Sequence, residues 1–228
     1  YIFNKDFFIS AYHKIGLELL ENYLKKFSTK MLDDLEKKSS IVIIGRPNAG
    51  KSTLLLQASH NYHERGMKTY LITAGFDKRA GDGKIGSRIG IASGADTFNA
   101  KEDMFQKIEL RLEKGPCSCV FIDEAQFLSE EQVWQLARVV DDLKIPVMCY
   151  GLRVDFQGKL FPGSAALLAL ADEMREIRTI CHCGKKATMV IRQDENGAVI
   201  KDGAQIQIGG NETYISLCRR HWREAIGD

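Results

Sequence analysis

Residues 41–52, IVIIGRPNAGKS, decide the fold: four apolar residues precede a glycine, four further residues and Gly-Lys-Ser. An unbroken apolar run of this length is typical of a strand buried on both faces of a parallel sheet. Apolar residues recur at helical spacing from Lys51 onward. A phosphate held by the loop would therefore lie at a helix N-terminus, where free N–H groups and the helix dipole favour negative charge. The stretch predicts a strand, a phosphate-binding loop and a helix.

The loop also predicts how a nucleotide and Mg²⁺ would be held. Two glycines allow tight turns that bring backbone N–H groups close to a polyphosphate. Lys51 is expected to reach the outer phosphates, and the Ser52 hydroxyl is expected to ligate Mg²⁺. The predicted nucleotide-binding residues of the loop are Gly45, Arg46, Pro47, Asn48, Ala49, Gly50, Lys51 and Ser52.

Strands and helices alternate after the loop. The pattern predicts helices over 51–65, 101–114 and 130–142, the last capped by Ser129, and strands over 69–73, 119–122 and 146–150. Residues 75–94 are rich in glycine and charge and are expected to form a mobile loop. The alternation predicts an α/β fold, a phosphate-loop parallel sheet flanked by helices.

The two ends of the chain differ from this middle part. Residues 7–38 carry apolar side chains at spacings of three and four, which is typical of an amphipathic helix packed on the main domain or on another subunit. After residue 178 the chain has short β runs, cysteines and a glycine pair. We therefore expect a helical extension over 1–39, a nucleotide-binding domain over 40–178 and a small lobe over 179–228.

The composition limits the class of protein. Of the 228 residues, 44% are hydrophobic and 27% are charged, as in ordinary soluble proteins. A net charge of +2 argues against bulk attraction to nucleic acid or anionic membranes, and no apolar run is long enough to span a bilayer. Six unevenly spaced cysteines are typical of intracellular thiols or metal ligands. We expect a cytoplasmic protein with no nucleic-acid or membrane partner.

Two acids, Asp123 and Glu124, follow the apolar run at 119–122. Ligands of open α/β sheets bind at the carboxyl ends of strands, and we expect this strand to lie beside the strand of the phosphate loop. Asp123 is expected to hold Mg²⁺, which leaves Glu124 free to accept a proton from a hydroxyl nucleophile. The alternative is that Glu124 only caps a turn.

Soft ligands near the C-terminus predict a metal site. They form a Cys-x-Cys pair and a Cys-x-x-His pair, namely Cys181, Cys183, Cys218 and His221. Three thiolates and one imidazole would close a structural Zn²⁺ site that has no open position for chemistry. His182 is a lesser candidate. Cys117, Cys119 and Cys149 lie in or beside core strands and are expected to be buried, unreactive thiols.

Four motifs together resemble the type II, cytosolic-type thymidine kinase family. They are NAGKST at 48–53, IDEAQF at 122–127, CYGLR at 149–153 and the two metal-ligand pairs. The resemblance runs from about residue 41 to the C-terminus. It implies transfer of the γ-phosphate of ATP to the 5′-hydroxyl of thymidine, forming dTMP by nucleotide salvage for DNA synthesis. It also implies a homotetramer with dTTP as feedback inhibitor.

The resemblance further implies roles for single residues. Glu124 matches the catalytic base of the family, and Asp123 and Gln126 of the same run join the ATP-binding set. The chain between the two ligand pairs would fold over the base as a lasso, with Phe156 and Phe161 walling a slot for the flat pyrimidine. The implied substrate-binding residues are Asp77, Arg79, Leu152, Phe156, Phe161, Ile206, Gln207, Ile208, Gly209 and Tyr214.

The sequence departs from the family pattern in two places. Pro47 stands where members usually carry a methionine against the thymine ring, and this affects the expected nucleoside range. Residues 1–39 precede the point where the family's chain normally begins, and the resemblance does not explain them.

Two other classes compete with this reading. The GRPN spelling at 45–48 is favoured by switch GTPases, but these need an Asn/Thr-Lys-x-Asp run after a strand, and the strand ending at Tyr150 is followed by Gly-Leu-Arg. A zinc-ribbon ATPase that binds nucleic acid would use Arg219, Arg220 and Arg223 on phosphates. The low net charge and the lack of aromatics interleaved with these arginines argue against it.

Overall fold

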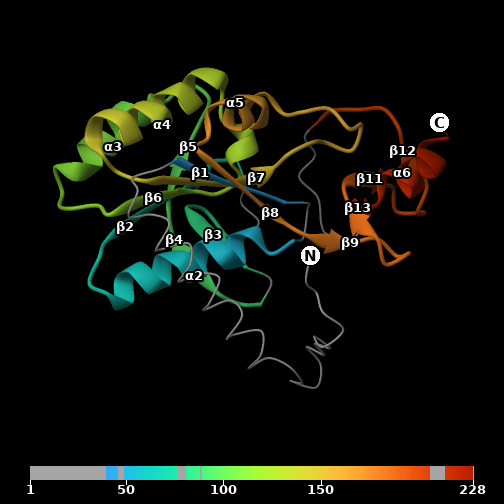
Figure 1. Cartoon of the computed structure of the whole chain (residues 1–228), viewed down its shortest axis with the longest axis horizontal. Helices are drawn as coiled ribbons and strands as arrows, with labels where there is room; N and C mark the ends of the chain where they lie inside the picture. The colour runs from blue at the N-terminus through green and yellow to red at the C-terminus, as the bar shows by residue number, and fades with distance from the viewer. Residues whose placement is uncertain (1–39, 46–48, 77–80, 88, 206–213, 228) are drawn as a thin grey trace. The chain divides into compact units, whose positions relative to one another are not determined.

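A computed structural model describes residues 40–45, 49–76, 81–87, 89–205 and 214–227 (Figure 1). These residues belong to one compact unit, Lys38–Asp228. The helix expected over 7–38 lies outside the described residues. Within the described part of the chain, no helix is long and apolar enough to cross a membrane.

A six-stranded sheet forms the centre of this unit, with the strand order β5-β2-β6-β7-β1-β8. Every neighbouring pair in it is parallel, which confirms the predicted α/β architecture. The strands are β1 (Ser40–Gly45), β2 (Thr69–Ala74), β5 (Asp96–Phe98), β6 (Cys119–Ile122), β7 (Val147–Leu152) and β8 (Glu173–Ile177).

The order of the strands corrects one expectation from the sequence. β6 does not lie beside β1, because β7 is inserted between them and pairs with both. Residues Val147 to Tyr150 of β7 are all buried, so this strand suits a central position with both faces covered. In the sheet, β7 therefore separates the strand that precedes the acids from the strand that precedes the phosphate loop.

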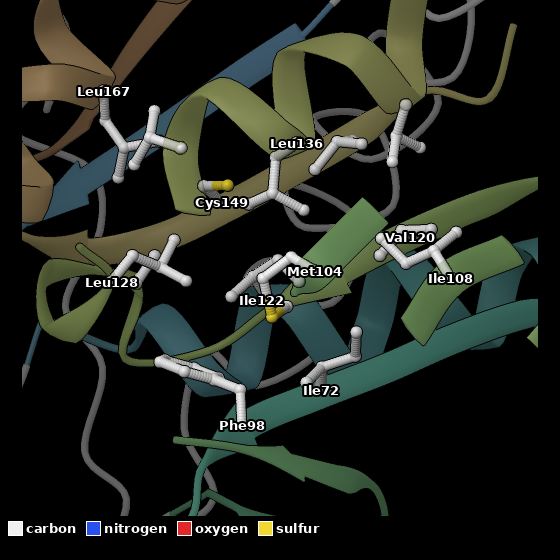
Figure 2. Packing of buried hydrophobic residues seen from close by; sticks show 14 of the residues in the cluster. Ile72, Phe98, Met104, Ile108, Val120, Ile122, Leu128, Leu136, Cys149 and Leu167 are labelled. Carbon is white, nitrogen blue, oxygen red and sulfur yellow. The ribbon is translucent and has the colours of Figure 1, made fainter. Parts of the chain in front are cut away.

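Helices cover both faces of the sheet (Figure 1). Val120 and Ile122 of β6 belong to the core cluster that includes Leu136, under the helices α3 (Met104–Leu112), α4 (Glu130–Leu143) and α5 (Pro162–Leu170) (Figure 2). Phe121 points to the opposite face, where its ring meets that of Tyr62 on α2 (Lys51–Glu64) edge to face at 5.9 Å. Burial on both faces explains why the strand segments are unbroken apolar runs.

Capping side chains set the bounds of two helices. Ser129 Oγ accepts from the N–H of Gln132, and Gln132 Oε1 accepts from the N–H of Ser129, so α4 begins with a capping box as expected from Ser129. The helix predicted over 101–114 is shorter than expected. Asp103 caps α3, and the N–H of Asn99 donates to Glu102, which holds the preceding residues in a turn.

The stretch expected to be a mobile loop contains regular structure instead. β3 (Lys84–Gly86) and β4 (Ala92–Gly94) pair as an antiparallel hairpin, although residues 77–80 and 88 lie outside the described part. Ile85 is buried, and Thr53 at the start of α2 donates to Ser87 Oγ at 2.9 Å. The buried Ile85 side chain and this hydrogen bond hold the hairpin in place, although its content of glycine and charged residues is typical of an irregular loop.

Small antiparallel sheets make up the C-terminal part. β9 (Thr179–Ile180) pairs with β10 (Lys186–Ala187), and β11 (Met189–Gln193) lies between β12 (Val199–Ile200) and β13 (Tyr214–Leu217). Helix α6 (Arg219–Ile226) follows β13. Ile191 and Leu217 share a small apolar cluster with two of the expected metal ligands, Cys181 and Cys218.

Lys144 ends α4 in a left-handed conformation, with φ 56°. A side chain with a Cβ atom is disfavoured there, and glycine is the usual residue at this position. We expect Lys144→Gly to raise the free energy of unfolding by about 0.5–1 kcal/mol, measured by urea denaturation. Lys144→Ala, the control, keeps the Cβ and should not stabilise the protein; an equal gain from both variants would show that backbone strain is not the cause.

Candidate functional site

The phosphate-loop segment joins β1 to α2 at the carboxyl edge of the sheet. Gly50 precedes α2 with φ 83°, a left-handed conformation that glycine adopts without cost. Because Gly50 has no side chain, it cannot accept hydrogen bonds from the N–H groups in the first turn of α2. Gly50 therefore does not compete with an anion for these N–H groups. The Lys51 side chain is buried at the same place. Arg46, Pro47 and Asn48 lie outside the described residues.

Ser52 and Asp123 meet although they are 71 residues apart in the sequence. Ser52 Oγ donates to Asp123 Oδ2 at 2.8 Å, and Asp123 Oδ1 accepts from the N–H of Glu124 at 3.0 Å. Burial and the neighbouring Glu124 raise the pKa of Asp123 to about 7, against the opposing effects of Ser52 and Lys51. A hydroxyl and a buried carboxylate that share one hydrogen bond can bind a divalent cation when it replaces the proton between them.

Glu124 is held by Gln126, which lies two residues further along the chain. Gln126 Nε2 donates to Glu124 Oε2 at 2.5 Å, and Gln126 Oε1 accepts from the N–H of Leu152 at 2.9 Å. The Gln126 side chain is only 1% exposed, so these contacts fix both ends of its amide. Gln126, expected among the nucleotide-binding residues, thus ties the candidate base to the end of β7.

The backbone of Glu124 is unusual. Its φ is 52°, and Glu124 and Lys144 are the two non-glycine residues with positive φ in the described ranges. Such conformations cost free energy and gather at functional sites, where they aim a side chain. Glu124 is 9% exposed and lies directly before the short 3-10 helix η1 (Ala125–Phe127). The conformation supports a role beyond the turn cap considered from the sequence.

Aromatic side chains continue from η1. Phe127 meets Phe161 edge to face at 5.9 Å, and Phe76 meets Phe127 at 4.7 Å. Phe161 is buried and Phe76 is partly exposed. Phe161 was expected from the sequence. Phe76, which follows β2 in the glycine-rich stretch, and Phe127, which ends the run IDEAQF, were not.

Phe156 lies in a tight turn after β7. Val154 and Leu160 pair across the turn, and Asp155 Oδ1 accepts from the N–H groups of Gln157 and Lys159. Both Asp155 and Phe156 are buried. Trp222 of α6 donates its indole N–H to the carbonyl of Phe156 at 3.1 Å, so the turn is in direct contact with the C-terminal part of the chain.

The four predicted metal ligands come together. Their ligand atoms all lie within 4.8 Å of one another. The Cys183 and Cys218 sulfurs are 3.9 Å apart, and His221 Nδ1 lies 3.2 Å from the Cys181 sulfur and 3.6 Å from that of Cys218. A tetrahedral Zn²⁺ with its usual bond lengths separates its ligands by roughly 3.5–3.8 Å. The four side chains therefore fit a closed zinc site.

His182 lies beside the four ligands. Its ring stacks on that of His221 at 4.2 Å between centroids. His182 does not belong to the group of four residues whose ligand atoms meet the geometry of a metal site. Outside the cluster, Cys119 and Cys149 are buried as expected, whereas Cys117 is only partly buried. Burial raises the pKa of all three thiols.

Part of the expected nucleoside site lies among residues that the structure leaves undescribed. These are Asp77, Arg79, Ile206, Gln207, Ile208 and Gly209. Tyr214 is described and pairs with Arg192 across strands β13 and β11. The structure thus brings the phosphate loop together with the acids after β6, and it gathers the four metal ligands into a cluster of their own. Of the nucleoside set it describes Leu152, Phe156, Phe161 and Tyr214.

Comparison with known proteins gives consistent results. A family model described as thymidine kinase matches residues 39–222. The thymidine kinase of Ruegeria pomeroyi is 74% identical over 181 residues, which cover 79% of this chain and 91% of that protein. That of Jannaschia sp. is 71% identical over 181 residues, covering 79% and 93%, and that of Photobacterium profundum is 56% identical over 180 residues, covering 79% and 94%.

Proposed function

The chain belongs to the thymidine kinase family of enzymes, and from this premise we propose that it transfers the γ-phosphate of ATP to the 5′-hydroxyl of thymidine, forming dTMP. The observation that carries the proposal is the chain of contacts from Ser52 through Asp123 and Glu124 to Gln126. It sets a proton acceptor beside the position where the phosphates and their metal would be held.

In this proposal the phosphates bind at the start of α2. The backbone N–H groups of the loop, other than at Pro47, and the Lys51 ammonium would hold the outer phosphates. Ser52 and Asp123 would bind Mg²⁺, which supplies positive charge against the charge that develops during phosphoryl transfer. Their 2.8 Å hydrogen bond supports this assignment, because both oxygens already point to one place.

Glu124 would act as the general base. A hydroxyl is a weak nucleophile until a positioned carboxylate accepts its proton. The left-handed backbone of Glu124 and the hydrogen bond from Gln126 together fix the orientation of the Glu124 carboxylate. We assign Gln126 to this orienting task, because its buried amide is held between Glu124 and the N–H of Leu152.

The nucleoside would lie between the end of β7 and the C-terminal lobe. Phe156 and Phe161 are buried aromatic side chains on the segment that follows Leu152, and they suit a flat pyrimidine. Tyr214 comes from β13, which pairs with β11. By family resemblance, Asp77, Arg79 and residues 206–209 would also belong to the thymidine-binding set.

We expect one tightly bound Zn²⁺ per chain at Cys181, Cys183, Cys218 and His221, because three thiolates and an imidazole form a closed site. Cys218→Ser should lower the zinc content and raise the thymidine KM far more than the ATP KM, since the metal would pin the lobe of residues 179–228. Elemental analysis of protein purified without added metal measures the stoichiometry. Cys117→Ser is the matched control, and zinc near zero with full activity would end the assignment.

Several family properties belong to the same proposal. The enzyme would work in the cytoplasm as a homotetramer that dTTP inhibits by feedback. The chain would consist of a helical extension over 1–39, a kinase domain over 40–178 and the zinc lobe. Size-exclusion chromatography with light scattering, and inhibition assays with dTTP, test the assembly and the regulation.

An assay with ATP, Mg²⁺ and a panel of nucleosides tests the proposed function. We expect ADP formation to require thymidine, with deoxyuridine as the nearest competitor, because Pro47 replaces the usual methionine. Titration with fluorescent adenine and guanine nucleotides separates this function from a GTPase. Nucleotide hydrolysis without any need for a nucleoside would contradict it.

A further inference from the structure

Arg192 is a buried cation without a counterion in the described part of the chain. It lies on β11, the central strand of the β12-β11-β13 sheet, and its side chain is 4% exposed. Among the described residues, no carboxylate lies within ion-pair distance of its guanidinium, and its buried Nε has no hydrogen-bond partner. Burying an unpaired guanidinium costs free energy of folding. Stability alone therefore does not explain an arginine at this position.

The contacts of Arg192 join two segments that are far apart in sequence. Its guanidinium carbon lies over the ring of Phe156, 4.0 Å from the ring centroid. Its Nη1 donates to the carbonyl of Ala204 at 2.9 Å. At Gly203, where φ is 137°, an added Cβ would lie only 2.6 Å from Nη2, so the backbone approaches the guanidinium as closely as glycine allows.

A second contact joins the same two segments. Gln205 Nε2 donates to Asp155 Oδ2 at 2.8 Å, and Asp155 is the buried carboxylate that builds the turn around Phe156. Two contacts therefore fix the turn 154–160 to residues 203–205: Arg192 touches both Phe156 and Ala204, and Gln205 donates to Asp155. The indole of Trp222 holds the Phe156 carbonyl in addition.

We propose that Arg192 is a positioning residue of the nucleoside site, which fixes the Phe156 ring against residues 203–205. The inference rests on the proposed function, in which Phe156 walls the slot for the pyrimidine. The guanidinium covers one face of the buried Phe156 ring, so the ring is held in one orientation in the wall that the proposed function assigns to it.

Two substitutions separate this role from a structural one. Arg192→Met removes the charge and the forked donors but keeps an apolar stem; Arg192→Lys keeps the charge but loses the planar fork. We expect Arg192→Met to raise both the thymidine Kd, measured by calorimetry without ATP, and the thymidine KM by about tenfold or more, because the freed Phe156 ring would adopt the binding orientation in only a fraction of the molecules. Arg192→Lys should be intermediate. The ATP KM should change by less than about twofold, since the contacts described for Arg192 are with Phe156 and residues 203–204 and not with the phosphate loop.

Arg178→Met is the matched control, because Arg178 is exposed and has no role in either site. A thymidine Kd for Arg192→Met within about twofold of the parent, with a lowered Tm, would overturn the inference and leave Arg192 only structural. If Arg192→Met does not fold, the same comparison with Arg192→Lys decides.

The contact between Arg192 and Phe156 can also be tested by protein stability, which does not depend on enzymatic activity or on the proposed function. Unfolding free energies of Arg192→Met, Phe156→Leu and the double variant form a double-mutant cycle. We expect the effects to be clearly non-additive, because each change removes the same contact. Additive effects would overturn the positioning role even in an active enzyme. Parent protein that binds no thymidine would contradict the proposed function alone, and the cycle would still report on Arg192 and Phe156.

Discussion

Glu124→Gln should lower kcat by roughly 10²–10⁴-fold, the usual contribution of a general base. The substitution keeps the size of the side chain and still offers an oxygen to Gln126 Nε2, which donates to Glu124 Oε2 in the parent. It removes only the capacity to accept the proton of the 5′-hydroxyl. Steady-state kinetics with saturating ATP, Mg²⁺ and thymidine measure the loss.

Substrate binding should survive this change. Lys51, Ser52 and Asp123 would still hold the phosphates and the metal, and the aromatic slot would still hold the base, so the Kd values of ATP and thymidine should stay close to those of the parent. Glu131→Gln, an exposed carboxylate in the first turn of α4, is the matched control and should keep full turnover. If Glu124→Gln keeps most of its turnover, another group is the base, and Asp77 is then the candidate.

Asp123→Asn should act on the metal and on nucleotide binding together. The amide oxygen can still accept from Ser52 Oγ, which lies 2.8 Å from Asp123 Oδ2 in the parent, so the local fold should persist. The loss of a charged ligand should raise the Mg²⁺ concentration needed for half-maximal activity and the ATP KM. Because a bound metal supplies several kcal/mol of charge stabilisation, we expect kcat/KM to fall by roughly a hundredfold or more.

Titrating Mg²⁺ at fixed ATP, and ATP at fixed free Mg²⁺, separates the two effects. Asp141→Asn removes an exposed carboxylate from α4 and serves as the control for the change in net charge. An unchanged Mg²⁺ requirement in Asp123→Asn would show that Asp123 does not bind the metal. The hydrogen bond between Ser52 and Asp123 would then have a structural role only.

The central strands could be predicted from the sequence because burial on both faces requires unbroken apolar runs. The edge strands β5 and β8 could not: β5 is short, and β8 carries charged residues at Glu173, Arg175 and Glu176. The position of β7 between β1 and β6 was also missed. Apolar runs resemble one another, and their order in the sheet depends on packing between distant parts of the chain.

The candidate site could be predicted only where its residues form local motifs. Lys51, Ser52, Asp123 and Glu124 stand at fixed spacings after apolar strands, and the metal ligands occur in two short pairs. The contacts of Gln126 with Leu152 and of Arg192 with Phe156 join distant segments, and a single arginine in a sequence is usually taken for a solvent-exposed residue. These supporting contacts became visible only in the folded chain.

The central claim is that this site transfers the γ-phosphate of ATP to the 5′-oxygen of thymidine with Glu124 as the base. The most direct test is ³¹P NMR of reactions that contain ATP, Mg²⁺ and thymidine, run in parallel with the parent protein and Glu124→Gln. We expect the parent to form one phosphomonoester, coupled to the 5′-methylene protons, in step with ADP, and Glu124→Gln to form it at the lowered rate. Inorganic phosphate as the only product beside ADP, or a phosphoester at the 3′-oxygen, would contradict the claim.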